Sequence, residues 1–177
     1  SVRLTVNSLP TADAGIDDTM CLRDSVTLGG SPTGTDGTGG YTYLWSPTAG
    51  LDDDTLSNPR ASPAITTNYI VTVTDINGCV DIDTITIVVN PLPVADAGAD
   101  DTICVADTIT IGGAPTATLG TPGYTYSWTP ADSLNDSTLA NPSAFPVTTT
   151  TYIVTVTDTN GCLATDTMTL LVNPLPV

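Results

Sequence analysis

The sequence predicts an all-β protein of two tandem β-sandwich domains, and three observations lead to this fold class. The chain of 177 residues matches itself without a gap when shifted by 83 residues, so that Cys21 falls on Cys104 and Trp45 on Trp128. Apolar and polar residues alternate with period two in segments rich in Val, Ile, Thr and Tyr, as half-buried strands do. No stretch keeps a helical period. Small domains in series usually extend, space or display rather than catalyse.

An early strand is expected at Val26 and Leu28, ended by the glycine pair 29–30. The segments 31–40 and 114–123 follow at equivalent places in the two repeats. Both are rich in Gly, Pro and Thr and differ most between the repeats. They are therefore predicted to be exposed loops.

The next strand places three aromatic residues on one face, which should be core. These are Tyr41, Tyr43 and Trp45, repeated as Tyr124, Tyr126 and Trp128.

The last two strands of the repeat form a hairpin. The strand 69–74 runs into the turn 75–78, whose Gly78 can adopt positive φ, and the chain returns through 83–89. In the returning strand Ile85, Ile87 and Val89 should face inward and the threonines outward. A two-layer sandwich of about seven strands per repeat accounts for the pattern.

The expected domain boundaries follow the repeat. Residues 1–11 are a closing strand and linker, 12–94 the first repeat and 95–177 the second. The joining segment 90–94 reads Asn-Pro-Leu-Pro-Val. Its two prolines restrict the backbone and make the segment stiff. We expect an extended rod in which each repeat advances by roughly 35 to 45 Å.

Residues 1–7 match the closing strand 84–90, although each complete repeat already has such a strand of its own. An apolar strand of Val2, Leu4 and Val6 left unpaired would be an exposed edge prone to association. We expect it to pair with another sandwich, either a preceding repeat or a neighbouring subunit that receives the strand.

Each repeat has two cysteines, which favours an exported, oxidising setting. Four cysteines allow three pairings, and repeat symmetry favours Cys21 with Cys79 and Cys104 with Cys162. Four free thiols are the alternative. A zinc site is disfavoured because the chain has neither a C-x-x-C spacing nor a histidine.

The composition excludes several classes of function. The formal net charge is −16, and every acidic residue is Asp. Only Arg3, Arg23 and Arg60 are basic, so nucleic acid and anionic membranes are poor partners. No apolar run reaches the roughly 20 residues of a membrane span. Without His or Lys the common nucleophile and base pairs cannot form, so no enzymatic activity is expected.

No organic cofactor is expected, and calcium is the one metal candidate because Asp is a short oxygen ligand suited to loop sites. The candidate ligands lie in acidic clusters: Asp17 and Asp18, Asp52 and Asp53, and Asp100 and Asp101. Asp is also an ordinary turn former, which offers a structural explanation for the same clusters.

Four stretches resemble a known family: 12–21, with its Ala-Asp-Ala-Gly opening, 40–47, 68–75 and 77–79. Together they are similar to the PKD-like, immunoglobulin-like tandem repeats of large bacterial surface proteins, among them gliding-motility adhesins exported by the type IX secretion route. The resemblance covers both repeats and implies Ig-like sandwiches in an extracellular stalk or adhesin. Cys79 departs from the antibody pattern because it follows the hairpin turn.

The triplet Asp-Ser/Thr-apolar recurs along the chain and resembles the O-glycosylation consensus of exported proteins from the same bacterial group. Asp-Thr is also a common way to leave a turn and enter a strand. The candidate hydroxyls belong to Thr19, Ser25, Thr55, Thr84, Thr102, Thr108, Ser133 and Thr167.

Two functions compete. The first is a structural segment of an extracellular, cell-surface fibre, stalk or filament, whose partners are neighbouring repeats or copies of itself. The second is an adhesive module that recognises glycans or another cell through the variable loops 33–40 and 116–123. The first is favoured because these loops have no exposed aromatic or Arg anchor.

Overall fold

The computed structural model describes residues 2–175. Contact density divides the chain into a first unit, residues 1–90, and a second unit, residues 91–177. The first strand of the second unit starts at Pro93. No helix long and apolar enough to cross a membrane occurs within residues 2–175.

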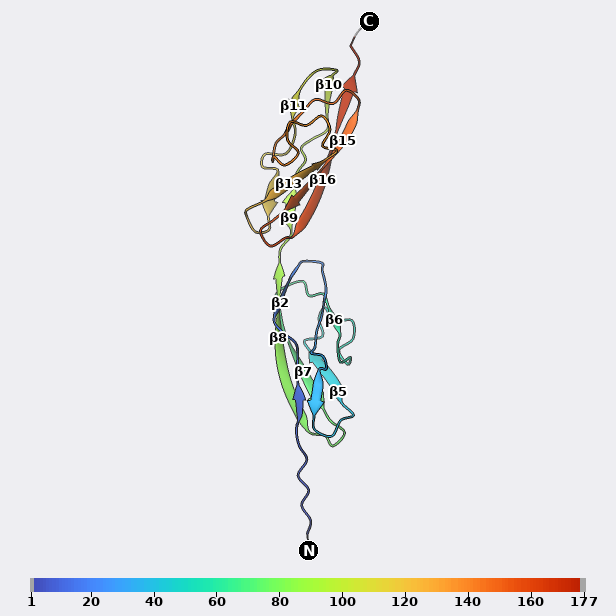
Figure 1. The fold of residues 1–177 in the computed structure, drawn as a ribbon, viewed down its shortest axis with the longest axis vertical. Coiled ribbons are helices and arrows are strands. Elements are labelled where there is room, and N and C mark those ends of the chain that lie inside the picture. The colour runs from blue at the N-terminus through green and yellow to red at the C-terminus, as the bar shows by residue number, and fades with distance from the viewer. Residues whose placement is uncertain (1, 176–177) are drawn as a thin grey trace. The chain divides into compact units, whose positions relative to one another are not determined.

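The main sheet of the first unit has the strand order β2-β8-β7-β5 (Figure 1). Strand β2 runs parallel to β8, and the other neighbours are antiparallel. Two short antiparallel pairs, β1 with β4 and β3 with β6, complete the unit. The strands are β1 (Pro10–Ala12), β2 (Asp18–Cys21), β3 (Val26–Thr27), β4 (Gly34–Asp36), β5 (Thr42–Ser46), β6 (Arg60–Ala61), β7 (Thr67–Thr74) and β8 (Val80–Asn90).

The second unit repeats this arrangement, with the main order β10-β16-β15-β13 and the short pairs β9 with β12 and β11 with β14. Its strands are β9 (Pro93–Ala95), β10 (Asp101–Cys104), β11 (Ile109–Thr110), β12 (Ala117–Leu119), β13 (Thr125–Thr129), β14 (Ser143–Ala144), β15 (Thr150–Thr157) and β16 (Leu163–Asn173). The predicted all-β fold of tandem Ig-like sandwiches is therefore confirmed for each unit.

One hydrophobic core fills each sandwich. In the first unit Trp45 and Tyr69 of the main sheet are fully buried against Leu28 and Ala61 of the opposite layer. The second core is built in the same way around Trp128 and Tyr152. The predicted inward faces are confirmed: Trp45, Ile85 and Ile87 are buried, and Tyr41, Tyr43 and Val89 pack at the margin.

The hairpin turn between β7 and β8 is formed as predicted, with Gly78 at φ 79°. The N–H of Asp75 donates to the carbonyl of Cys79 at 3.0 Å, and the N–H of Gly78 donates to the carbonyl of Asp75 at 2.9 Å.

The segments predicted to be exposed loops contain short strands instead. Strand β4 pairs with β1, and β12 pairs with β9. Thr33 and Thr116 beside them are buried, and the single O–H of each lies within hydrogen-bond distance of two backbone carbonyls. These internal hydrogen bonds let polar residues lie inside the sandwich.

Candidate functional site

The first unit has two distinct ends, which we call leading and trailing. At the leading end, β1 begins at Pro10 beside the β7–β8 turn. A Cβ added to Gly37, at φ 61°, would lie 3.1 Å from both the Asp75 Oδ2 and the Pro10 Cα, so the three residues are close neighbours. At the trailing end, Cys21 of β2 lies opposite Asn90, the last residue of β8.

The second unit has the same two ends. Gly120 packs between the Asp158 carboxylate and Pro93 at its leading end. Cys104 lies opposite Asn173, the last residue of β16, at its trailing end.

The buried carboxylate of Asp75 organises the leading end of the first unit. It accepts hydrogen bonds from the backbone N–H groups of Thr38 at 3.1 Å and of Asn77 and Cys79 at 2.9 Å. Burial alone would raise the pKa of Asp75, but these hydrogen bonds outweigh it and lower the pKa below its ordinary value.

Asp158 has the same role in the second unit. Its carboxylate accepts from the N–H groups of Thr121, Asn160 and Cys162. Burial opposes the shift, yet the hydrogen bonds lower the pKa of Asp158 as well. The sequence signal for this role is Asp-x-Asn-Gly, in which an aspartate side chain closes the turn over the N–H two residues on.

The predicted disulfides within each repeat are wrong. Cys21 pairs in register with Asn90, whereas Cys79 directly precedes Val80, at the opposite end of the same 11-residue strand. At about 3.3 Å per residue the two cysteines lie about 36 Å apart. A disulfide needs Cα atoms about 4.4–6.8 Å apart.

Cys104 and Cys162 are separated in the same way, because Cys104 lies opposite Asn173 and Cys162 precedes Leu163 at the far end of β16. Cys79 and Cys104 carry free thiols. Cys21 and Cys162 are disulfide-bonded.

The N-terminal segment 2–9 forms no strand and is exposed along its length, as the trace that leaves the first unit in Figure 1 indicates. Val2 is 100% exposed, Leu4 85% and Val6 84%. Ser1, its first residue, lies outside the described residues.

The candidate calcium ligands are used as hydrogen-bond acceptors for the backbone. Asp17 accepts from the N–H of Thr86 at 2.8 Å, and its counterpart Asp100 accepts from Thr169 at 2.7 Å. Asp18 and Asp101 each bond to the N–H of the next residue.

In the later cluster, Asp52 accepts from the N–H groups of Asp53 and Arg60. The hydroxyl and N–H of Thr55 bond to Asp53 and lower the pKa of its carboxyl. Across residues 2–175 the structure brings together no group of three Asp, Cys or other metal-binding side chains.

The candidate glycosylation hydroxyls are accessible. Ser25 and Ser133 are half-buried, and the six threonines Thr19, Thr55, Thr84, Thr102, Thr108 and Thr167 are exposed.

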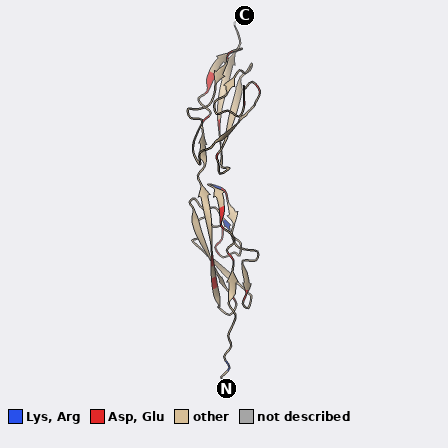
Figure 2. Cartoon of the chain, turned by 60° about the vertical axis from the view of Figure 1, so that its left-hand side comes forward, with Lys and Arg blue, Asp and Glu red and all other residues tan. Residues whose placement is uncertain are grey.

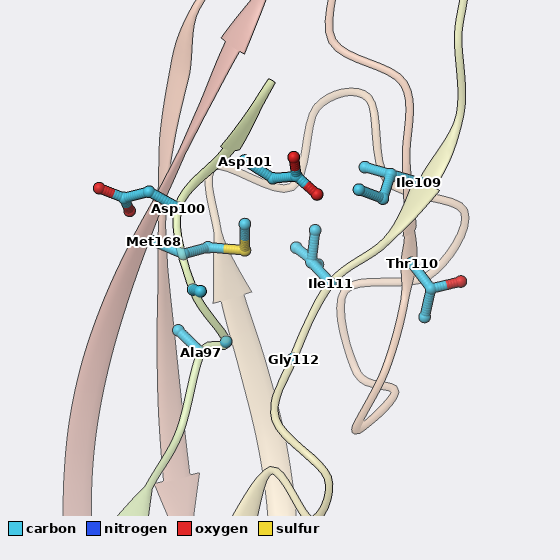
Figure 3. Close-up of a pocket in the computed structure, with 10 residues that line it drawn as sticks. Ala97, Asp100, Asp101, Ile109, Thr110, Ile111, Gly112 and Met168 are labelled. Atoms are coloured by element: carbon cyan, nitrogen blue, oxygen red, sulfur yellow. The ribbon is translucent and has the colours of Figure 1, made fainter. Parts of the chain in front are cut away.

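A pocket of about 230 Å³ lies beside β10 and β11 in the second unit. The side chains of Met168 and Ile111 approach each other across it, whereas the Asp100 carboxylate points away (Figure 3). The volume is below the roughly 300–1,000 Å³ typical of small-molecule sites.

Acidic residues are spread over both units, while the three arginines belong to the first (Figure 2). The second unit is therefore negative without any compensating side-chain cation.

No family model matches the sequence, and no curated protein does. Solved structures similar to the chain include the IG1 and IG2 domains of DIP-gamma, at 12% identity over 94% of this chain and 98% of that one, with a TM-score of 0.43. The titin I-band fragment I67–I69 is 12% identical over 97% of this chain and 67% of that one, with a TM-score of 0.44. The PKD domain of the KIAA 1837 protein is 27% identical over 49% of this chain and 92% of that one, with a TM-score of 0.39.

Proposed function

We propose that the chain is a non-enzymatic structural segment of an extracellular fibre, stalk or filament on a cell surface, similar to the repeats of gliding adhesins. Its partners are neighbouring repeats or further copies of itself. One observation carries this proposal: the N-terminal segment has the apolar pattern of a buried strand, yet it is exposed.

The exposed segment has the residues of a core strand. Under the 83-residue repeat, Val2 and Leu4 correspond to Ile85 and Ile87 of β8. Those two residues are only 3% and 0% exposed, because they face the sandwich core. An apolar face of this kind is costly to leave in water, so it supports pairing with a further sandwich.

The partner sandwich takes one of two forms. It is the preceding repeat of a longer polypeptide, or it belongs to a separate subunit that receives the segment as an added strand. In both forms Val2, Leu4 and Val6 form the joint of an extended assembly.

Trypsin tests the joint, because Arg3 lies inside the segment. The isolated 177-residue chain should be cut after Arg3, since the surrounding backbone is exposed and forms no strand. In native assemblies the same bond should resist cleavage. Arg60, which lies in β6, serves as the internal control. Equal cleavage after Arg3 in the isolated chain and in native assemblies would refute the proposal that this segment forms the joint.

Denaturing electrophoresis of reduced native assemblies separates the two forms. Separate subunits should give a band near 18.1 kDa, shifted upward by any attached glycan. A continuous array should give one very large chain.

The adhesive alternative, with a glycan or cell-surface ligand on the segments 33–40 and 116–123, is less well supported. The exposed side chains there come from Thr, Pro, Asp36 and Leu119. None is the aromatic or Arg anchor that usually dominates recognition.

A further inference from the structure

The two units differ in the segment that connects the short opposite layer to the third strand of the main sheet. In the second unit this segment joins β14 to β15, and residues 145–147 read Phe-Pro-Val where residues 62–64 of the first unit read Ser-Pro-Ala. Phe145 is 45% exposed and Val147 68% exposed, and the proline between them is buried. Both apolar side chains therefore lie on the outer side of the segment, at the trailing end where β15 begins.

A carboxylate lies next to this apolar pair in the second unit. The N–H of Phe145 donates to the carbonyl of Ser133 at 2.9 Å, within an antiparallel contact between the two segments. Continuing the register by one residue brings Asp132 beside Pro146. Asp132 is exposed, and the first unit has Ala49 in its place.

The second unit has two unfavourable features beside this carboxylate. Ser133 has a φ of 63°, in the left-handed region that favours glycine, and the first unit has Gly50 at this position with a φ of 81°. The Tyr152 hydroxyl is buried without a hydrogen-bond partner in the described residues, whereas the Tyr69 hydroxyl donates to the carbonyl of Ala49 at 2.7 Å. Such local costs are typical of places that serve function rather than stability.

We propose that Asp132, Phe145 and Val147 form a docking patch on the second unit that receives the N-terminal segment 2–6 of a second copy of the chain. This inference rests on the proposed function, in the form in which separate subunits follow one another. In that form the exposed apolar segment of one copy needs a receptor on another copy, and the patch supplies one.

The patch and the segment are complementary in polarity and in charge. The three apolar residues of the segment would cover Phe145 and Val147, and an exposed aromatic side chain is a frequent anchor of protein interfaces. Arg3 is the one charged residue of the segment and is opposite in sign to Asp132. Its long aliphatic stem lets the guanidinium reach a carboxylate at the rim while its apolar neighbours face the patch. The second unit has no basic side chain of its own to pair with Asp132.

The first unit provides an internal comparison. At the positions that correspond to the patch it has the small residues Ala49, Ser62 and Ala64, with neither an aromatic ring nor an acid. Its own exposed apolar residue in this segment is Ile65, at 74% exposure. The substitutions that remove the patch are therefore known to be compatible with the fold of a repeat.

Binding of a labelled peptide tests the patch. Fluorescence anisotropy would measure the binding of a peptide of residues 1–9 to the full 177-residue chain, at a concentration at which the chain alone is monomeric. The parent chain should bind the peptide. The double variant Phe145→Ser and Val147→Ala, which carries the residues of the first unit, should bind it about tenfold more weakly or less. Asp132→Ala should weaken binding to a smaller extent and reduce its dependence on salt.

Two controls accompany this measurement. Ile65→Ser, which removes an exposed apolar residue from the first unit, should leave the affinity unchanged. A peptide with Val2→Ser, Leu4→Ser and Val6→Ser should not bind the parent chain. Every chain variant should keep the thermal transition of the parent chain, because the altered side chains lie at the surface.

Equal binding of the peptide to the parent chain and to the double variant would overturn the patch, and so would the absence of binding to a folded parent chain. Neither result would decide the proposed function. Protection of the bond after Arg3 in native assemblies tests that function separately, so failure of the patch and failure of the joint can be told apart.

Discussion

The indole Nε1 of Trp45 donates a hydrogen bond of 3.0 Å to the carbonyl oxygen of Leu56, and Trp128 makes the same bond to Leu139. Each indole thus fills the core of its unit while its polar atom holds the long β5–β6 or β13–β14 connection. Because both rings are fully buried, Trp45→Ala or Trp128→Ala should cost about 3–5 kcal/mol in its own repeat.

Denaturant unfolding of the full chain measures this loss. Leu44→Ala is the matched control, since Leu44 lies on the same strand but is largely exposed. It should change the free energy of unfolding by less than about 0.5–1 kcal/mol. A Trp45→Ala chain with an unchanged transition would contradict the core assignment.

Tyr69 and its counterpart in the second unit, Tyr152, should respond differently to loss of the hydroxyl. Tyr69 donates to the carbonyl of Ala49 at 2.7 Å, so Tyr69→Phe should cost about 0.5–1.5 kcal/mol. The Tyr152 hydroxyl is buried without a hydrogen-bond partner in the described part of the chain. Burial, and then the charge of Asp132, raise its pKa.

Tyr152→Phe should therefore leave stability unchanged or increase it, as judged by the thermal transition of the second unit. Equal losses in both variants would show that Tyr152 is hydrogen-bonded in solution.

Acid should weaken the leading end of each unit. The pKa of Asp75 is lowered in the folded state, so its ionised form stabilises the fold above the unfolded pKa of about 3.9. That contribution is lost as the pH falls through the lower folded pKa. Asp75→Asn should thus destabilise the chain most near pH 7, and its difference from the parent chain should shrink toward pH 3.

Unfolding midpoints across this pH range test the expectation, with Asp24→Asn at an exposed carboxylate as the control. If the difference in stability between Asp75→Asn and the parent chain stays constant with pH, Asp75 does not act as a charged hydrogen-bond acceptor.

Glycan on the triplet hydroxyls should raise the intact mass of native material above 18.1 kDa. Fragment spectra should place the sugar on exposed hydroxyls such as Thr84 and Thr167 and leave the buried Thr33 and Thr116 unmodified. A native mass equal to that of the sequence would remove this proposal.

Local pattern was enough to predict the strands with a strong period. Ile85 and Ile87 face inward, and Gly78 closes the β7–β8 turn, because alternation and turn chemistry act over a few residues. The burial of Thr33 could not be predicted in this way, because its hydroxyl donates to the carbonyl of Ser57, which lies far along the chain.

Repeat symmetry alone could not decide whether the two cysteines of a repeat lie close enough to bond. Their separation in the first unit depends on the parallel register of Cys21 with Asn90, a contact between residues 69 apart in the sequence that no local pattern encodes.

The parallel pair in each unit decides how that unit responds to tension. In the first unit the segments 10–21 and 79–90 each run from the leading to the trailing end. Because β2 lies parallel to β8, a pull on the two ends of the unit would slide one strand along the other and load their hydrogen bonds together.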